Sequence, residues 1–121
     1  MIYYEQYLYL KSMRTFKTGA SRNDDTGKLD FEGFLSPIAL ENFAEYMNEN
    51  RIQADGNVRD SDNWQKGIDL DSYMKSMWRH FFDVWKAHRG LPTEHDITTN
   101  LSALFFNVQG YLHEYEKNRI K

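Results

Sequence analysis

Apolar side chains recur at helical spacing in three segments of the chain. The first segment, residues 36–50, carries them at positions i, i+3, i+4 and i+7 from Leu40. Ser36 suits the N-cap of a helix, and Pro37 fits the first helical position because its missing N–H would have no partner there. The pattern predicts a core-facing helix that ends near Asn50.

The second segment has the strongest pattern. Either Asp69 or Asp71 can cap a helix, and Gly90 followed by Pro92 ends it. Two apolar stripes run along this helix, so we expect it to be central and covered on both sides. The stripes are Leu70, Tyr73, Met74, Met77, Phe81 and Val84 on one face, and Trp78, Phe82 and Trp85 on a second.

A last helix follows, and Thr93 with Asp96 forms a start that resembles a capping box. We expect its apolar stripe to face the core; the stripe comprises Ile97, Leu101, Leu104, Phe105, Val108 and Leu112. The opposite stripe is small and polar, which lets either another helix or a ligand approach the backbone closely. Its members are Asn100, Ala103, Asn107, Gly110 and Glu114.

Two segments, residues 15–35 and 51–68, are polar, contain glycine and lack sustained periodicity. Structureless loops of this length are uncommon in compact domains unless they serve a function. The tyrosine-rich residues 2–10 fit a short strand or a helix, and we expect them to dock on the body or on a neighbouring subunit. The sequence thus predicts a mostly α fold, a small helical bundle with two long polar loops. Residues 1–13 would be an aromatic extension of one domain, 14–121.

Composition narrows the class of protein. A length of 121 residues suits one domain, and the 16% share of aromatic residues favours a homo-oligomer, since a small domain cannot hide every ring alone. The absence of cysteine excludes disulfides and thiolate metal sites. No apolar run approaches a membrane span and no signal peptide is apparent, which predicts a cytoplasmic protein without a membrane partner. The net charge of −3 argues against nucleic-acid binding.

The two loops contain candidates for anion and base recognition. In the first loop, glycines with Arg22 and Lys28 have the composition of a phosphate cradle, although a solvated loop would look the same. In the second loop, Asn63 can read a base edge, Trp64 can stack on a base and Lys66 can contact a phosphate. The alternative for Trp64 is a core plug just before the next helix.

Two side chains of the second predicted helix are candidates for catalysis. His80 and Asp83 are i, i+3 neighbours, so both can point at one place and form an acid–base pair or ligate a metal. A histidine with only a structural role is the alternative. Glu41, on the preceding helix, either lies on the solvated surface of that helix or forms a metal site together with Asp83.

Three stretches together resemble the bacteriophage dATP/dGTP diphosphohydrolase family, whose members are similar in kind to all-helical nucleoside-triphosphate pyrophosphatases. They are TGASRNDDTGKLDFEGFLSP (18–37), RDSDNWQKGIDLDSYMKSMWRHFFDVWKAHRG (59–90) and ALFFNVQGYLHE (103–114). The resemblance covers residues from about 14 to 115, in order and at similar spacing. It implies a phage nucleotide-pool enzyme, acting in the cytoplasm of the infected host, that hydrolyses purine (deoxy)nucleoside triphosphates to monophosphate and pyrophosphate.

The resemblance also implies roles for particular residues. It implies Mg²⁺ or Mn²⁺ as cofactor, with Glu41 and Asp83 as metal ligands and His80 and Asp83 as catalytic residues. The nucleotide-binding residues that it implies are Arg22, Lys28, Asn63, Trp64, Lys66, Arg79 and Asn107.

One departure from the family pattern bears on catalysis. Thr98 and Thr99 stand where relatives tend to carry acidic residues, and the EExxE and ExxD motifs of the wider pyrophosphatase group are missing. Binding is therefore better supported than turnover. The alternative function is a non-catalytic binding protein that sequesters a signalling nucleotide on the same scaffold.

Overall fold

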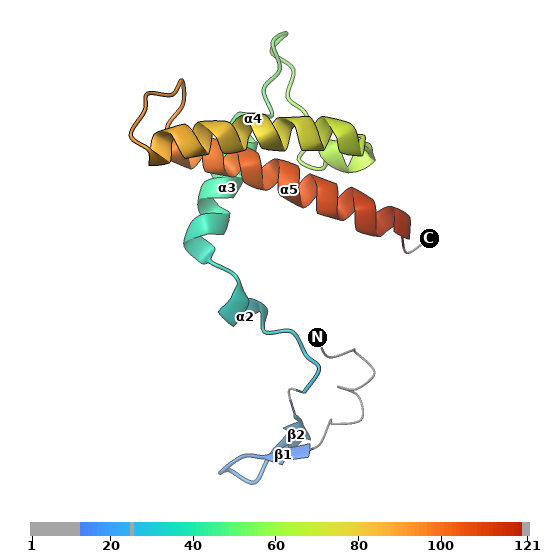
Figure 1. The fold of residues 1–121 in the computed structure, drawn as a ribbon. Helices are drawn as coiled ribbons and strands as arrows, with labels where there is room; N and C mark the ends of the chain where they lie inside the picture. Colours follow the sequence, from blue (N-terminus) through green and yellow to red (C-terminus); the bar gives the residue numbers. More distant parts are fainter. Residues whose placement is uncertain (1–12, 25, 120–121) are drawn as a thin grey trace. The chain divides into compact units, whose positions relative to one another are not determined.

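Two long antiparallel helices, α4 (Leu70–His88) and α5 (Ile97–Arg119), dominate the computed structural model (Figure 1). Residues 13–24 and 26–119 are described, so the expectation for residues 2–10 lies outside the described residues. Asp69 caps α4 by accepting a hydrogen bond from the Ser72 N–H at 2.8 Å, as one of the two sequence alternatives predicts. None of the described helices has the length and apolar composition that a membrane span requires.

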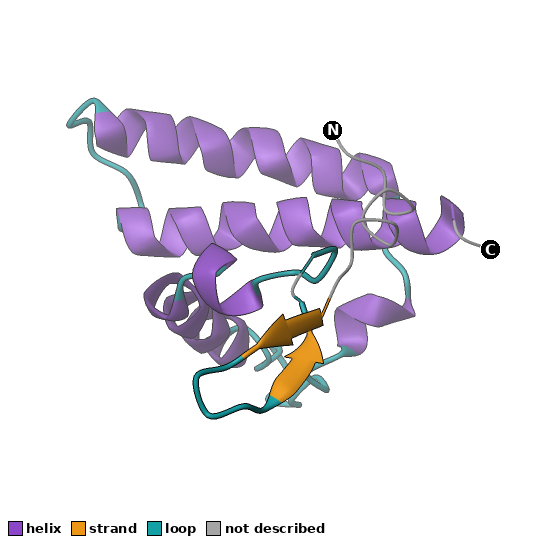
Figure 2. Cartoon of the chain, turned by 90° about the horizontal axis from the view of Figure 1, so that it is seen from below, coloured by secondary structure: helices purple, strands orange, loops and turns teal. Residues whose placement is uncertain are grey.

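Helix α3 (Pro37–Glu49) has the predicted bounds and packs against α5. Its Phe43 ring lies 4.5 Å from the ring of Phe105, measured between centroids. Helices α3 and α4 do not pack against each other, so α5 is the element that both share (Figure 2). The mostly helical architecture that the sequence predicts is confirmed, but its central helix is α5, not α4.

The side of α5 that faces α4 is the small, polar stripe, not the apolar one. Tyr73 of α4 is 1% exposed and lies directly against Gly110 of α5, where a Cβ atom would overlap the tyrosine ring. Asn100, Ala103 and Asn107 are buried on the same side. Small residues allow the two backbones to approach closely enough for a large ring to fill the space between them. The sequence left open whether a helix or a ligand approaches this stripe, and in the structure it is the helix α4.

The prediction that the apolar stripe of α5 faces the core is therefore wrong for most of the stripe, although Phe105 packs against α3. Leu101, Val108 and Leu112 are 47%, 48% and 60% exposed. The prediction that α4 is covered on both sides is also wrong, because Trp78 and Trp85 are 69% and 47% exposed. Each of the two helices packs against the other through one face only. Helical periodicity shows that a helix has two stripes, but it does not reveal which of them is buried within the chain.

The first predicted loop contains more structure than expected. Strands β1 (Met13–Thr15) and β2 (Ser21–Asn23) pair in antiparallel register, and Gly19 takes a positive φ of 88° in the turn between them. The single-turn helix α2 (Phe31–Phe34) follows, capped by Asp30.

The chain forms two compact units that divide between Ser36 and Pro37. The division into an extension, 1–13, and one domain, 14–121, stays a prediction.

Candidate functional site

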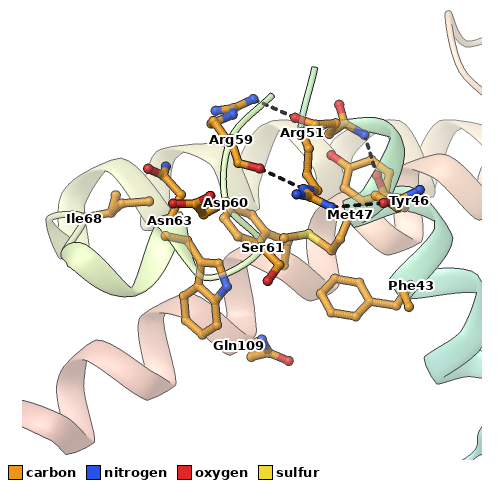
Figure 3. A pocket seen from close by; sticks show the side chains of 15 residues that line it. Phe43, Tyr46, Met47, Arg51, Arg59, Asp60, Ser61, Asn63, Ile68 and Gln109 are labelled. Carbon is orange, nitrogen blue, oxygen red and sulfur yellow. Dashed lines mark hydrogen bonds between the residues drawn. The ribbon is translucent and has the colours of Figure 1, made fainter. Parts of the chain in front are cut away.

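A cavity of about 560 Å³ lies in the second unit, where α3, the segment 51–68 and α5 meet (Figure 3). This volume falls within the range of small-molecule sites. The apolar part of its wall is largely aromatic and comprises Phe43, Ala44, Tyr46, Met47, Trp64, Ile68 and Phe106. The polar part contains Arg51, Arg59, Asp60, Ser61, Asn63 and Gln109. We call this cavity the α3–α5 pocket.

The polar part of the pocket is built by a short hairpin-like turn. An isolated antiparallel bridge joins Ile52 to Val58, and Gly56 takes a positive φ of 86° in the turn between them. Asp55 stabilises this turn by accepting a hydrogen bond from the Asn57 N–H at 2.9 Å. The bridge brings together Arg51 and Arg59, which are eight positions apart in sequence.

The side chains of the two arginines donate hydrogen bonds to backbone carbonyls on both sides of the turn. The Arg51 Nε–H donates to the Arg59 carbonyl at 2.7 Å, and Arg59 Nη2 donates to the Asn50 carbonyl at 2.7 Å (Figure 3). Neither guanidinium forms an ion pair with a carboxylate of the described residues. Because each guanidinium has five N–H donors, both retain donors and an uncompensated charge for an anionic ligand.

Trp64 combines the two roles that the sequence leaves open. It lies in the short 3₁₀ helix η1 (Asn63–Lys66), and its ring contacts Phe106 and His113 edge to face, with centroids 6.3 Å and 4.9 Å away. It is only half-buried and also lines the α3–α5 pocket. Trp64 therefore packs on α5 and still presents surface to a ligand, next to the half-buried Asn63.

Tyr46 contributes a hydroxyl to the same wall. Burial raises the pKa of this phenol above its usual value of 10.0. A phenol is protonated at neutral pH even at the ordinary pKa, so this hydroxyl can donate a hydrogen bond.

The remaining predicted nucleotide-binding residues lie outside the pocket lining. Arg22, on β2, and Lys28 are exposed residues of the first unit, whereas the pocket is built within the second unit. Lys66 is exposed on η1, and Arg79 is exposed on α4, where it donates to Ser76 Oγ at 2.8 Å.

Asn107 has little surface to offer a ligand. Its side chain belongs to a residue that is 6% exposed, and its amide donates to the Ala103 carbonyl one turn earlier at 2.8 Å. Within the chain, Asn107 thus packs in the buried side of α5. Helix α4 lies against this stripe, and the nucleotide contact that the resemblance implies for Asn107 stays a prediction.

His80 and Asp83 are both half-buried on α4, outside the pocket lining. Partial burial lowers the pKa of His80 below its usual value of 6.5, and the neighbouring Arg79 lowers it further. Asp83 acts in the opposite direction, and His95 adds a smaller lowering effect. His80 is therefore a neutral imidazole near pH 7.

This lowered pKa predicts a stability change with pH. Protonating His80 is harder in the folded chain than in the unfolded one, so stability is retained above about pH 6.5 and falls as the pH drops through the folded-state pKa. Urea unfolding at pH 7.5, 6.5 and 5.5 should show this loss, and H80Q should reduce the slope. H88Q, an exposed histidine variant on the same helix, is the control. Equal slopes for H80Q and the unmodified protein would contradict the assignment.

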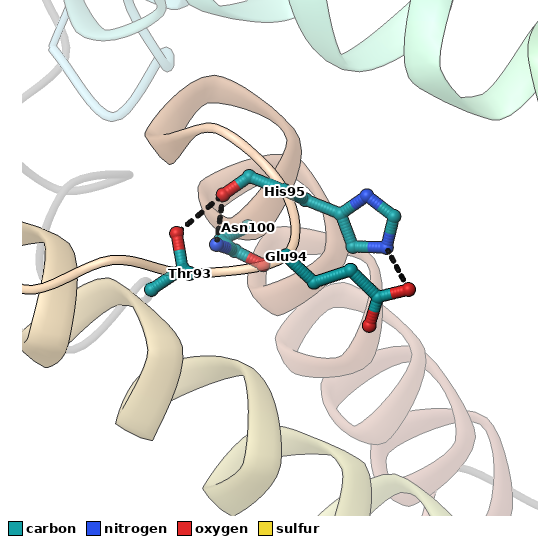
Figure 4. A network of polar contacts seen from close by, with 4 residues as sticks. All are labelled: Thr93, Glu94, His95 and Asn100. Atoms are coloured by element: carbon teal, nitrogen blue, oxygen red, sulfur yellow. Dashed lines mark hydrogen bonds and ion pairs between the residues drawn. The ribbon is translucent and has the colours of Figure 1, made fainter.

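The loop that precedes α5 contains a small polar network (Figure 4). The His95 carbonyl accepts hydrogen bonds from Thr93 Oγ1 at 2.5 Å and from the Asn100 amide at 3.2 Å. Asp96, not Thr93, caps α5, since its carboxylate accepts from the Thr99 N–H at 2.8 Å. This hydrogen bond lowers the pKa of Asp96. The predicted capping-box role of Thr93 is thus corrected: its hydroxyl orders the loop instead.

The acidic residues do not gather into a metal site within the described part of the chain. Glu41 is exposed on α3 and Asp83 lies on α4, and these two helices do not pack together. Among residues 13–24 and 26–119, no group of three or more His, Asp or Glu side chains is placed to hold a metal ion. These side chains do not fit the magnesium site that the resemblance implies, and we assign no metal-dependent step to them.

Arg51 and Arg59 are the site residues that sequence reasoning missed. Arg51 lies outside the stretches that carry the family resemblance, Arg59 is the first residue of one of them, and each is an ordinary surface cation when viewed alone. The available signal was the Asp55-Gly56 turn, which predicts that the segments on both sides of it run close together.

Comparisons of the chain with family models, with curated proteins and with solved structures found no match.

Proposed function

We propose that this protein binds a purine nucleotide in the α3–α5 pocket. The observation that carries the proposal is the meeting, in one cavity of about 560 Å³, of aromatic surface with two guanidinium groups that form no ion pair with any carboxylate of the described residues. Trp64 would stack on the base, and Asn63 would hydrogen-bond to its edge. Arg51 and Arg59 would bind the phosphates.

Hydrolysis of the bound nucleotide is the second candidate function. It is favoured by the resemblance of three stretches to the dATP/dGTP diphosphohydrolase family; Asp60 places one carboxylate in the pocket lining, and no metal site is assigned to it. On this proposal a purine (deoxy)nucleoside triphosphate would yield the monophosphate and pyrophosphate in the cytoplasm of an infected bacterium. On the first proposal the nucleotide would be sequestered unchanged.

One titration separates the two functions. Purified protein is titrated calorimetrically with dATP, dGTP, ATP and GTP, with and without Mg²⁺ or Mn²⁺, and the ligand is then recovered and weighed by mass spectrometry. Binding with intact ligand supports sequestration, and release of pyrophosphate supports hydrolysis. If no nucleotide binds under any of these conditions, both proposals fail.

Substitution of Arg59 tests the location of the site. R59Q should weaken nucleotide binding by about 10- to 100-fold, because one charge-assisted hydrogen bond contributes about 1.5–3 kcal/mol. K66Q is the matched control, since it removes a positive charge from the same segment but outside the pocket lining. Circular dichroism should show that both variants remain folded. Equal losses in R59Q and K66Q would place the ligand elsewhere.

A further inference from the structure

The two long helices expose apolar side chains with a regular spacing. On α4 the residues 74, 78, 81 and 85 follow one another at intervals of four, three and four, and all four are large and apolar. On α5 the residues 97, 101, 104, 108, 111 and 115 continue the same alternation. This is the seven-residue repeat of helices that pack against other helices. We call these ten side chains the apolar face: Met74, Trp78, Phe81, Trp85, Ile97, Leu101, Leu104, Val108, Tyr111 and Tyr115.

Most of the apolar face is open in the single chain. Met74, Phe81 and Trp78 are 41%, 53% and 69% exposed, and only Leu104 and Tyr111 of the α5 set are half-buried. Taking roughly 200 Å² for each large side chain, the face exposes roughly 1,000 Å². The largest apolar patch of a typical monomer is about 300–600 Å², whereas a stable interface buries about 800 Å² on each partner. The face thus has the area of an interface.

The spacing on α4 and α5 places both sets on one side of the helix pair. Relative to Tyr73, which points at α5, Phe81 and Trp85 lie about a quarter to a third of a turn around α4. On α5, Gly110 and Asn107 face α4, and Val108 lies at a similar angle around the helix from them, in the same direction of rotation. Because the two helices are antiparallel, equal rotations in the same direction bring Phe81, Trp85 and Val108 to the same side of the helix pair. The two stripes therefore form one broad surface.

The partner that fits this surface is a pair of helices of similar length. The α5 stripe, from Ile97 to Tyr115, is roughly 27 Å long at 1.5 Å per residue. In the described chain, α2 has four residues, and α3 is already packed against α5 through Phe43 and Phe105. Among the described segments, α4 and α5 of a second copy are the two helices that have the same spacing.

We propose that two copies of this chain associate through their apolar faces into a four-helix bundle, with α4 and α5 from each copy. A two-fold axis sets the same patch against itself, and this face is suited to that arrangement because none of its ten members is charged. The α3–α5 pocket stays accessible in the dimer. Its α5 residue Phe106 is two positions before Val108 and so points to nearly the opposite side of the helix.

The mass of the full-length protein in solution tests the dimer. Light scattering coupled to size exclusion should give twice the 14.4 kDa of one chain. F81E and V108E should each shift this mass to that of one chain at the same concentration while helicity by circular dichroism is retained, because both side chains are already about half exposed in the monomer. K75E introduces the same residue on an exposed position of α4 outside the face and should remain dimeric.

Tryptophan fluorescence supplies a second measurement that leaves every residue of the apolar face unchanged. In W64F, the remaining tryptophans are Trp78 and Trp85, both on the apolar face. Their emission should shift to the red on dilution as the dimer dissociates. A monomeric protein at about 50 μM overturns the proposal, and blue-shifted emission in that monomer would indicate that the chain's own first unit covers the face. A dimer whose mass neither F81E nor V108E changes overturns it as well.

Discussion

Replacing Gly110 with alanine should destabilise the protein, although the same substitution inside a helix ordinarily stabilises it. Alanine exceeds glycine in helix propensity by about 1 kcal/mol, so a helix that tolerates the methyl group would gain stability. At this position the methyl carbon would overlap Cε1 and Cζ of the Tyr73 ring and lie 2.6 Å from its hydroxyl oxygen. Overpacking of this kind costs about 1–3 kcal/mol. Urea unfolding should therefore show a net loss for G110A.

The ring of Tyr73 is the cause of this expected loss, and a double-mutant cycle tests it. Y73L removes the aromatic ring, so G110A should be far less harmful in the Y73L background than in the unmodified protein. A coupling energy near zero would show that Tyr73 is not the obstacle. A stabilising G110A would show that α4 and α5 do not approach as closely as the structure places them.

The ends of the helices follow from the sequence because they depend on local chemistry. Asp69 caps α4 through a hydrogen bond to a residue only three positions away, and Pro37 begins α3 as predicted. The interior of the protein does not follow in this way. Helix α5 carries an apolar stripe and a small, polar stripe, and an isolated sequence gives no reason to bury the second. The choice depends on Tyr73, whose ring needs the space that Gly110 provides.

The sequence predicts those residues of the site that are neighbours in the chain, but not those that the fold brings together. Asn63 and Trp64 are neighbours in sequence, and the structure places both in the lining of the pocket. Arg51 and Arg59 are eight positions apart in sequence, and the Ile52–Val58 bridge brings them together because the chain reverses its direction there. Lys66, in contrast, follows Trp64 closely in sequence but is exposed outside the lining, because a short 3₁₀ helix points successive side chains in different directions.

The exposed face and the pocket use α5 in complementary ways. Phe106 and Gln109 line the pocket, while Val108, between them in sequence, lies on the apolar face. Nucleotide binding and dimerisation are consequently expected to be separable by substitution: R59Q should affect the first and V108E the second. Measuring dimer mass in R59Q and nucleotide affinity in V108E would show whether the two functions are independent.

Replacing Trp64 with alanine should lower stability and abolish nucleotide binding together. The indole packs against Phe106 and His113, and its removal would leave a void beside α5. Truncation of a buried aromatic side chain lowers the free energy of unfolding by about 3–5 kcal/mol. Because Trp64 is only half-buried, we expect W64A to lose about 3 kcal/mol or less. The same truncation removes the stacking surface proposed for the base, so we expect affinity to fall at least about 100-fold, which corresponds to roughly 3 kcal/mol.

The phenylalanine variant separates the two roles of Trp64. W64F retains an aromatic ring against Phe106 and should lose only part of the stability that W64A loses. It also retains a face on which a base can stack, so its nucleotide affinity should fall by about 10-fold at most. Calorimetric titration of both variants at a temperature where W64A remains folded gives the comparison. If W64A binds a nucleotide as tightly as the unmodified protein, Trp64 is only a packing residue of α5 and the base does not stack on it.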